Sequence, residues 1–155
     1  MEPQDQHPAF DEARRRRATL HDQLVHVEQA ISSPATGRIE DWMAQVVKEL
    51  VGLRDAFEQH VLVTEKPDGL YEEIITRAPR LAGAVHKLGE QHPAIAGSIT
   101  DRLSRMEAMQ AGTETWAIDD CRDDLQRMLG LIVRHRQQGA DLVWEAYNLD
   151  IGGPE

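Results

Sequence analysis

The stretch LIVRHRQQGADLV, residues 131–143, places a histidine and a glycine where a helix would carry core residues. Leu131, Ile132, His135, Gly139 and Leu142 follow one another at the three- and four-residue spacing of one helix face. An imidazole in such a stripe has a donor and an acceptor that must be satisfied away from water. What the surrounding helices bring to this level therefore decides what the histidine can do.

The rest of the chain repeats an apolar period close to 3.6 residues, and no stretch alternates as a strand would. We predict long helices over about residues 9–32, 39–65, 79–110 and 115–148, with a short helical piece at 70–78. Each apolar stripe is one-sided, so the helices must cover one another. With short connections, the prediction is an all-α, up-down-up-down antiparallel four-helix bundle. Residues 1–155 would form one domain, with a helical core at about 9–148 and short flexible termini.

The composition excludes several classes of function. A net charge of −10 over 155 residues argues against a nucleic-acid surface and against an anionic membrane patch. The four arginines at 14–17 are one short block in an acidic chain, and we interpret them as a solvated helix face. No signal peptide is recognisable, and no apolar run approaches the roughly 20 residues of a membrane span. We expect a cytoplasmic protein.

Four of the seven histidines fall one on each long helix: His21, His60, His92 and His135. At 100° per residue, His92 and His135 lie within about 40° of the middle of their stripes. His21 and His60 lie at the edges of theirs, about 70–80° away. Any one of them alone would more often be a satisfied core or boundary histidine than a ligand. Convergence of several on one point would reverse that interpretation.

The heights of the histidines along the bundle test for such convergence. With a rise of 1.5 Å per residue from the end that carries the first and last interhelical loops, His60, His92 and His135 lie at about 30, 32 and 33 Å. His21 lies at about 18 Å, a couple of turns short. Three imidazoles at one level would be costly to bury unless something satisfies them together, and a metal ion does so. Histidine-rich sites favour iron, zinc, copper or nickel over calcium or magnesium.

Three stretches carry a resemblance to a known family: AFEQHVLVTEKPDGLYEEI at 56–74, RAPRLAGAVHKLGEQHPAI at 77–95 and VRHRQQGADLVWEAYNLDIGG at 133–153. Together they resemble the hemerythrin-like (HHE cation-binding) domain, over nearly the whole chain. The resemblance implies a bundle that binds non-haem iron in a di-iron centre and serves in oxygen binding or in oxygen, redox or iron sensing. It also implies His21, His60, His92 and His135 as the metal ligands, one from each long helix.

The chain departs from that pattern at the carboxylate positions. Four residues after His60 the family carries an acid, and here that position is Thr64. Glu65 follows, but on a straight helix it points about 140° away from His60. Near the last histidine, Gly139 and Ala140 stand where an acid is expected. Both bridging carboxylates are therefore missing from their usual places, which leaves open whether the iron site is mononuclear or dinuclear.

Two residues beside the histidines invite further expectations. Gly139 costs roughly 1 kcal/mol relative to alanine inside a helix, so it should have a reason for being there. It would leave an open coordination position, a place for water, or room for a bulky neighbour. Pro93 removes one backbone hydrogen bond next to His92, and we expect a kink there.

Two hypotheses from different classes follow. In the first, the bundle holds a non-haem metal, most simply iron, through His60, His92 and His135, with His21 as a further candidate. It would bind or sense a small diatomic ligand such as oxygen rather than catalyse turnover. In the second, the site has degenerated, and the bundle is a metal-free interaction or regulatory module whose acidic surface meets a protein partner or a second copy of itself. A mononuclear metalloenzyme is a weaker third, because no general base is evident near the histidines.

Overall fold

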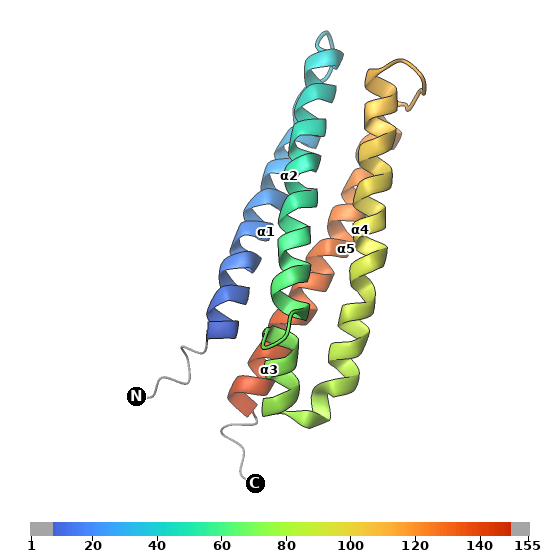
Figure 1. Cartoon of the computed structure of the whole chain (residues 1–155). Coiled ribbons are helices and arrows are strands. Elements are labelled where there is room, and N and C mark those ends of the chain that lie inside the picture. The colour runs from blue at the N-terminus through green and yellow to red at the C-terminus, as the bar shows by residue number, and fades with distance from the viewer. Residues whose placement is uncertain (1–7, 150–155) are drawn as a thin grey trace.

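The computed structural model describes residues 8–149, in which the regular structure is entirely helical (Figure 1). The all-α four-helix bundle predicted from the sequence is confirmed. Its elements are α1 (Pro8–Ser32), α2 (Ile39–Glu65), α3 (Leu70–Arg77), the 3-10 turn η2 (Pro79–Leu81), α4 (Ala82–Gln110), α5 (Ile118–Trp144) and the π-helical turn η3 (Glu145–Leu149).

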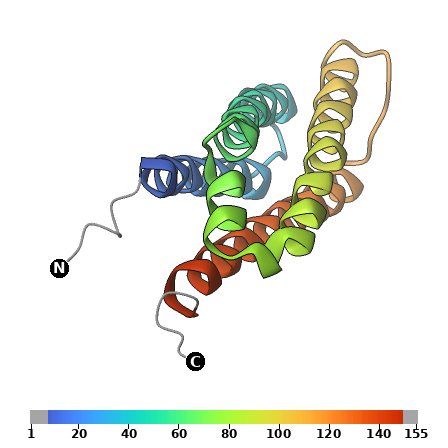
Figure 2. The same cartoon turned by 60° about the horizontal axis from the view of Figure 1, so that its bottom comes forward.

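The four long helices form a closed ring. Helix α1 packs against α2, α2 against α4, α4 against α5, and α5 returns to α1. The short helix α3 lies at one end of the bundle, below the end of α2, where it contacts α1, α2, α4 and η3 (Figures 1 and 2). Helix α3 therefore covers that end of the bundle, and its side chains can point from there toward the core.

The start of the last long helix departs from the prediction, since this helix begins at Ile118 rather than near residue 115. Trp116 is buried at the end of the core, with the Arg105 guanidinium 4.0 Å above its ring. Ala117 has an extended backbone, with ψ at 135°. Seating the indole inward requires this extended segment, so the helix starts after it.

The core consists of two apolar clusters. The larger one fills the end that carries the α1–α2 and α4–α5 loops and includes Leu50, Phe57 and Ile132. The smaller one lies at the α3 end and includes Tyr71 and Leu88. A thin polar layer lies where the two clusters meet, and it contains the three buried histidines.

Among the described residues, no helix has both the length and the apolar content needed to cross a membrane.

Helix α4 continues through Pro93, which is exposed on its surface. The flexible termini expected from the sequence, at residues 1–7 and 150–155, lie outside the described residues.

Candidate metal centre

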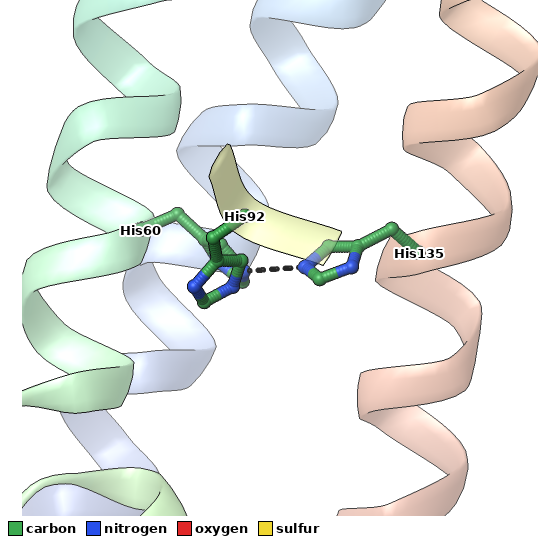
Figure 3. A group of neighbouring side chains, drawn as sticks. All are labelled: His60, His92 and His135. Carbon is green, nitrogen blue, oxygen red and sulfur yellow. Dashed lines mark hydrogen bonds between the residues drawn. The ribbon is translucent and has the colours of Figure 1, made fainter. Parts of the chain in front are cut away.

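Three buried histidines from three different helices meet in the polar layer (Figure 3). His60 on α2, His92 on α4 and His135 on α5 expose only 5, 2 and 2% of their surface. One nitrogen from each ring lies within 4.8 Å of one nitrogen from each of the others. The closest pair is His60 Nε2 and His135 Nε2, 3.2 Å apart. The three rings thus share a level, as their heights along the helices predict.

The structure does not bring His21 to this group. It lies on α1 with its side chain exposed to solvent, and the group of potential ligands contains only His60, His92 and His135 among the described residues. His21 does not reach the group because it lies a couple of helical turns short of the common level and at the edge of its apolar stripe. Of the four histidines expected to meet, one from each long helix, the structure brings together three from three helices.

Aromatic rings enclose the histidines. The Phe57 ring contacts all three imidazoles, with centroid distances of 5.5 Å to His60, 5.7 Å to His92 and 5.9 Å to His135. From the side of α3, the Tyr71 ring stacks on His92 at 5.7 Å with 16° between the planes. The imidazoles are therefore held between apolar walls in which their orientations are fixed by packing.

Two of the imidazoles are also oriented by hydrogen bonds on their Nδ1 side. Nδ1 of His135 is 2.7 Å from Gln91 Oε1. An amide oxygen only accepts, so Nδ1 of His135 carries the proton and its Nε2 keeps a lone pair. Gln91 is held in this orientation because its Nε2 donates to Gln138 Oε1 at 3.0 Å. Nδ1 of His92 likewise donates to Glu65 Oε2 at 2.5 Å.

This arrangement is typical of metal-binding histidines, which donate one ring N–H to a carboxylate or carbonyl and offer the other nitrogen to the ion. Sequence analysis missed both partners. Glu65 does point away from His60, but it reaches the ring of His92 on the neighbouring helix. Gln91 directly precedes His92 in the sequence but serves His135 on α5. Each contact joins two different helices, so the residue spacing along one helix does not indicate it.

His60 differs from the other two rings. Its Nε2 donates to His135 Nε2, because that atom has no proton of its own. Its Nδ1 is buried and has no hydrogen-bond partner. A buried polar atom without a partner costs about 1–3 kcal/mol. Moving the ring proton from Nε2 to Nδ1 would leave His60 Nε2 free to bind an ion beside His135 Nε2.

The electrostatic environment keeps the imidazoles neutral. Burial, together with the neighbouring imidazoles and the charge of Arg17, lowers the pKa of His60 to about 3. Burial, reinforced by His92, lowers the pKa of His135 to about 4. Burial also lowers the pKa of His92, although its hydrogen bond to Glu65 acts in the opposite direction. Neutral imidazole is the form that binds metals, so protons do not compete for these rings near pH 7.

Gly139 on α5 faces Leu88 on α4. A Cβ added there would lie 3.7 Å from Leu88 Cδ2, which is an ordinary contact. An alanine methyl group would therefore fit beside Leu88, and nothing in the packing explains the glycine.

We expect Gly139→Ala to raise the free energy of unfolding by up to about 1 kcal/mol, because alanine has the higher helix propensity and its methyl group fits. Urea denaturation measures the change. Gly130→Ala is the matched control, since Gly130 lies on the same helix, is exposed and has nothing within 4 Å of its added Cβ. A loss of stability in Gly139→Ala alone would show that the Leu88 contact is tighter than the structure indicates.

An open groove of about 440 Å³ leads from the surface to His92. It lies between α2 and α4, with Phe57 and His92 on its inner side and Pro93 on its rim. Its lining is mostly apolar, apart from Glu58, Glu65 and His92. The groove therefore brings a mostly apolar surface to the edge of His92.

Comparison of the chain with protein-family models, with curated proteins and with solved structures gives no match. What the site can do is therefore argued from its own geometry and chemistry.

Proposed function

We propose that this protein binds a transition-metal ion, with non-haem iron as the first expectation, through His60, His92 and His135. The observation that carries the proposal is the meeting of three buried, neutral imidazoles from three helices at one level. Each ring would otherwise bury polar atoms at a cost, and one of them, His60 Nδ1, already lacks a partner. The nitrogen donors fit the borderline divalent ions iron, zinc, copper and nickel.

The distance between His60 Nε2 and His135 Nε2 supports this proposal. With metal–nitrogen bonds of about 2.0–2.1 Å, a separation of 3.2 Å corresponds to a nitrogen–metal–nitrogen angle of about 100°. That angle lies between those of octahedral and tetrahedral sites. Binding all three rings would draw His92 toward the other two. We expect one ion per chain, because the carboxylate nearest the cluster, Glu65, bonds to His92 Nδ1 on the outer side of that ring.

The role that this site supports best is the binding or sensing of a small diatomic ligand such as oxygen, as the resemblance to hemerythrin-like domains also suggests. The groove beside His92 gives an uncharged molecule a largely apolar route to the cluster. Three protein ligands leave coordination positions for further groups, as in metal sites that act on ligands rather than only support the fold.

A second candidate function is a metal-free interaction module that binds a protein partner or a second copy of the chain. The specific observation in its favour is the exposure of apolar side chains on the bundle surface, such as Leu62 on α2 and Leu131 and Val133 on α5. In that case the hydrogen bonds among His60, His135, His92 and Tyr71 would be a structural network only.

Metal content and titration separate the two functions. We expect protein grown with added iron and purified without a tag or oxygen to hold about one ion per chain by mass spectrometry. His135→Ala should lower the affinity at least 100-fold, because it removes one of three ligands. His86→Ala is the matched control, since it removes an exposed histidine from the bundle surface.

Full retention of the ion in His135→Ala would refute the assignment of these ligands. Wild-type protein that takes up neither Fe²⁺ nor Zn²⁺, with no change in its melting temperature on addition of either ion, would favour the interaction module. Two ions per chain would show that carboxylates reach the site from places other than those described above.

A further inference from the structure

Tyr71 is a buried side chain that approaches the histidines from outside the four long helices. It comes from α3, the short helix at the end of the bundle. Its hydroxyl oxygen lies 3.1 Å from His92 Nε2, and its ring stacks on the same imidazole. Because Nδ1 of His92 holds the proton that bonds to Glu65, Nε2 accepts the hydrogen bond from the Tyr71 hydroxyl.

The Tyr71 hydroxyl therefore occupies the lone pair that an ion would use on His92. A proton and an ion cannot share that lone pair, so binding of the ion must change the position or the protonation of Tyr71. We propose that the Tyr71 oxygen is a fourth protein ligand and that the ion takes the place of the proton between this oxygen and His92 Nε2. This inference rests on the proposed metal-binding function and names a ligand of the same site.

The distances suit this exchange. At bond lengths of about 2.0–2.1 Å, the 3.1 Å between the Tyr71 oxygen and His92 Nε2 corresponds to an angle of about 100° at the ion. The pair formed by His60 and His135 has nearly the same spacing, at 3.2 Å. Two ligand pairs of matching width would together give a four-ligand site of three nitrogens and one oxygen.

The surroundings of the Tyr71 phenol favour its protonated form when no ion is bound. Burial, and the nearby negative charge of Glu65, raise the pKa of Tyr71, while the neighbouring Thr64 hydroxyl acts in the opposite direction. The phenol thus keeps its proton until a cation replaces it. On binding, the O–H bond breaks, a metal–oxygen bond forms and the proton leaves to solvent, with no change of oxidation state. The resulting phenolate reduces the positive charge that a divalent or trivalent ion brings into the core.

This ligand would also account for the missing carboxylates. Thr64 stands four residues after His60, and its neutral hydroxyl cannot be the anionic ligand there. The hydroxyl instead donates to the backbone oxygen of His60 at 2.8 Å. The anionic oxygen would thus come from α3 rather than from α2, and binding of the ion would fasten the covering helix to the bundle.

Zinc titration followed by ultraviolet difference spectroscopy tests the inference. Zinc itself does not absorb in this range, so a phenolate signal reports ionised tyrosine. The chain has two tyrosines, Tyr71 and Tyr147. We expect one ionised phenol per bound zinc at pH 7 in wild-type protein and in the control Tyr147→Phe, and none in Tyr71→Phe. Zinc affinity should fall about 10-fold or more in Tyr71→Phe alone.

Bound zinc is counted independently by equilibrium dialysis and mass spectrometry. Tyr71→Phe removes one oxygen and keeps the stacked ring, and circular dichroism checks that the variant is folded. Zinc bound to wild-type protein without a phenolate signal would overturn the inference and leave the proposed function standing. A signal that persists in Tyr71→Phe would overturn it as well. Failure of wild-type protein to bind any ion would refute the proposed function and this inference together. With Fe³⁺, the same ligand would produce a visible phenolate-to-iron absorption band that Tyr71→Phe lacks.

Discussion

Metal-free protein is expected to lose about 5 kcal/mol of unfolding free energy between pH 7 and pH 4.5. The pKa of His60 is lowered to about 3 and that of His135 to about 4, from an ordinary value of 6.5. Between these values the unfolded chain binds more protons than the folded chain, so stability falls as the pH falls. Each of the two groups contributes about 1.4 kcal/mol per pH unit.

A loss of that size is a large part of the roughly 5–15 kcal/mol that holds a typical domain together. Urea denaturation at several pH values, in the presence of a chelator, measures it. The loss begins near pH 6.5, where the unfolded histidines start to bind protons, and continues down to the folded values near pH 4 and 3. A stability that stays constant from pH 7 to pH 5 would show that the folded rings titrate like exposed histidines.

The fold could be predicted from the sequence because four one-sided apolar stripes leave few arrangements that bury all of them. The predicted ends of α2, at residues 39 and 65, agree with the structure. The start of α5 was predicted wrongly because the position of Trp116 depends on a pocket at the end of the bundle. Helical periodicity carries no information about such a pocket.

The candidate site could be predicted in part for the same reason. Helical rise converts residue number into height, so the shared level of His60, His92 and His135 is visible in the sequence, as is the displacement of His21. The partners of these rings depend instead on which helices are neighbours and on how far a side chain reaches. Glu65 illustrates this difficulty, because it points away from the histidine on its own helix and toward His92 on the next.

Tyr71 was harder still to predict. Its helix is short, and the sequence does not fix how this helix packs against the end of the bundle. Only the packing of α3 against α1, α2 and α4 places the phenol beside His92. The periodicity of the long helices therefore does not predict site residues that come from the segments between them.

The double substitution His60→Leu and His135→Leu is expected to stabilise metal-free protein while abolishing metal binding. Leucine has a volume similar to that of histidine and suits the surrounding side chains, which include Phe57 and Ile132 of the larger core cluster. The change removes the His60 Nδ1 atom that has no partner, and it replaces buried polar atoms by apolar ones. We expect a gain of about 2 kcal/mol at pH 7, measured by urea denaturation with a chelator.

The same variant decides why the histidines are there. It should lose most of the pH dependence described above, because the two groups responsible for it are gone, so its advantage over wild-type protein should grow toward pH 5. Residues kept for a function commonly cost stability, and their removal then strengthens the fold. A histidine network that serves the fold alone would give the opposite result, since the lost hydrogen bonds of His135 with His60 and Gln91 would then outweigh the cost of burying the rings. A loss of stability in the double variant, together with unchanged behaviour of the exposed control His86→Ala, would therefore assign the cluster a structural role and count against a metal site.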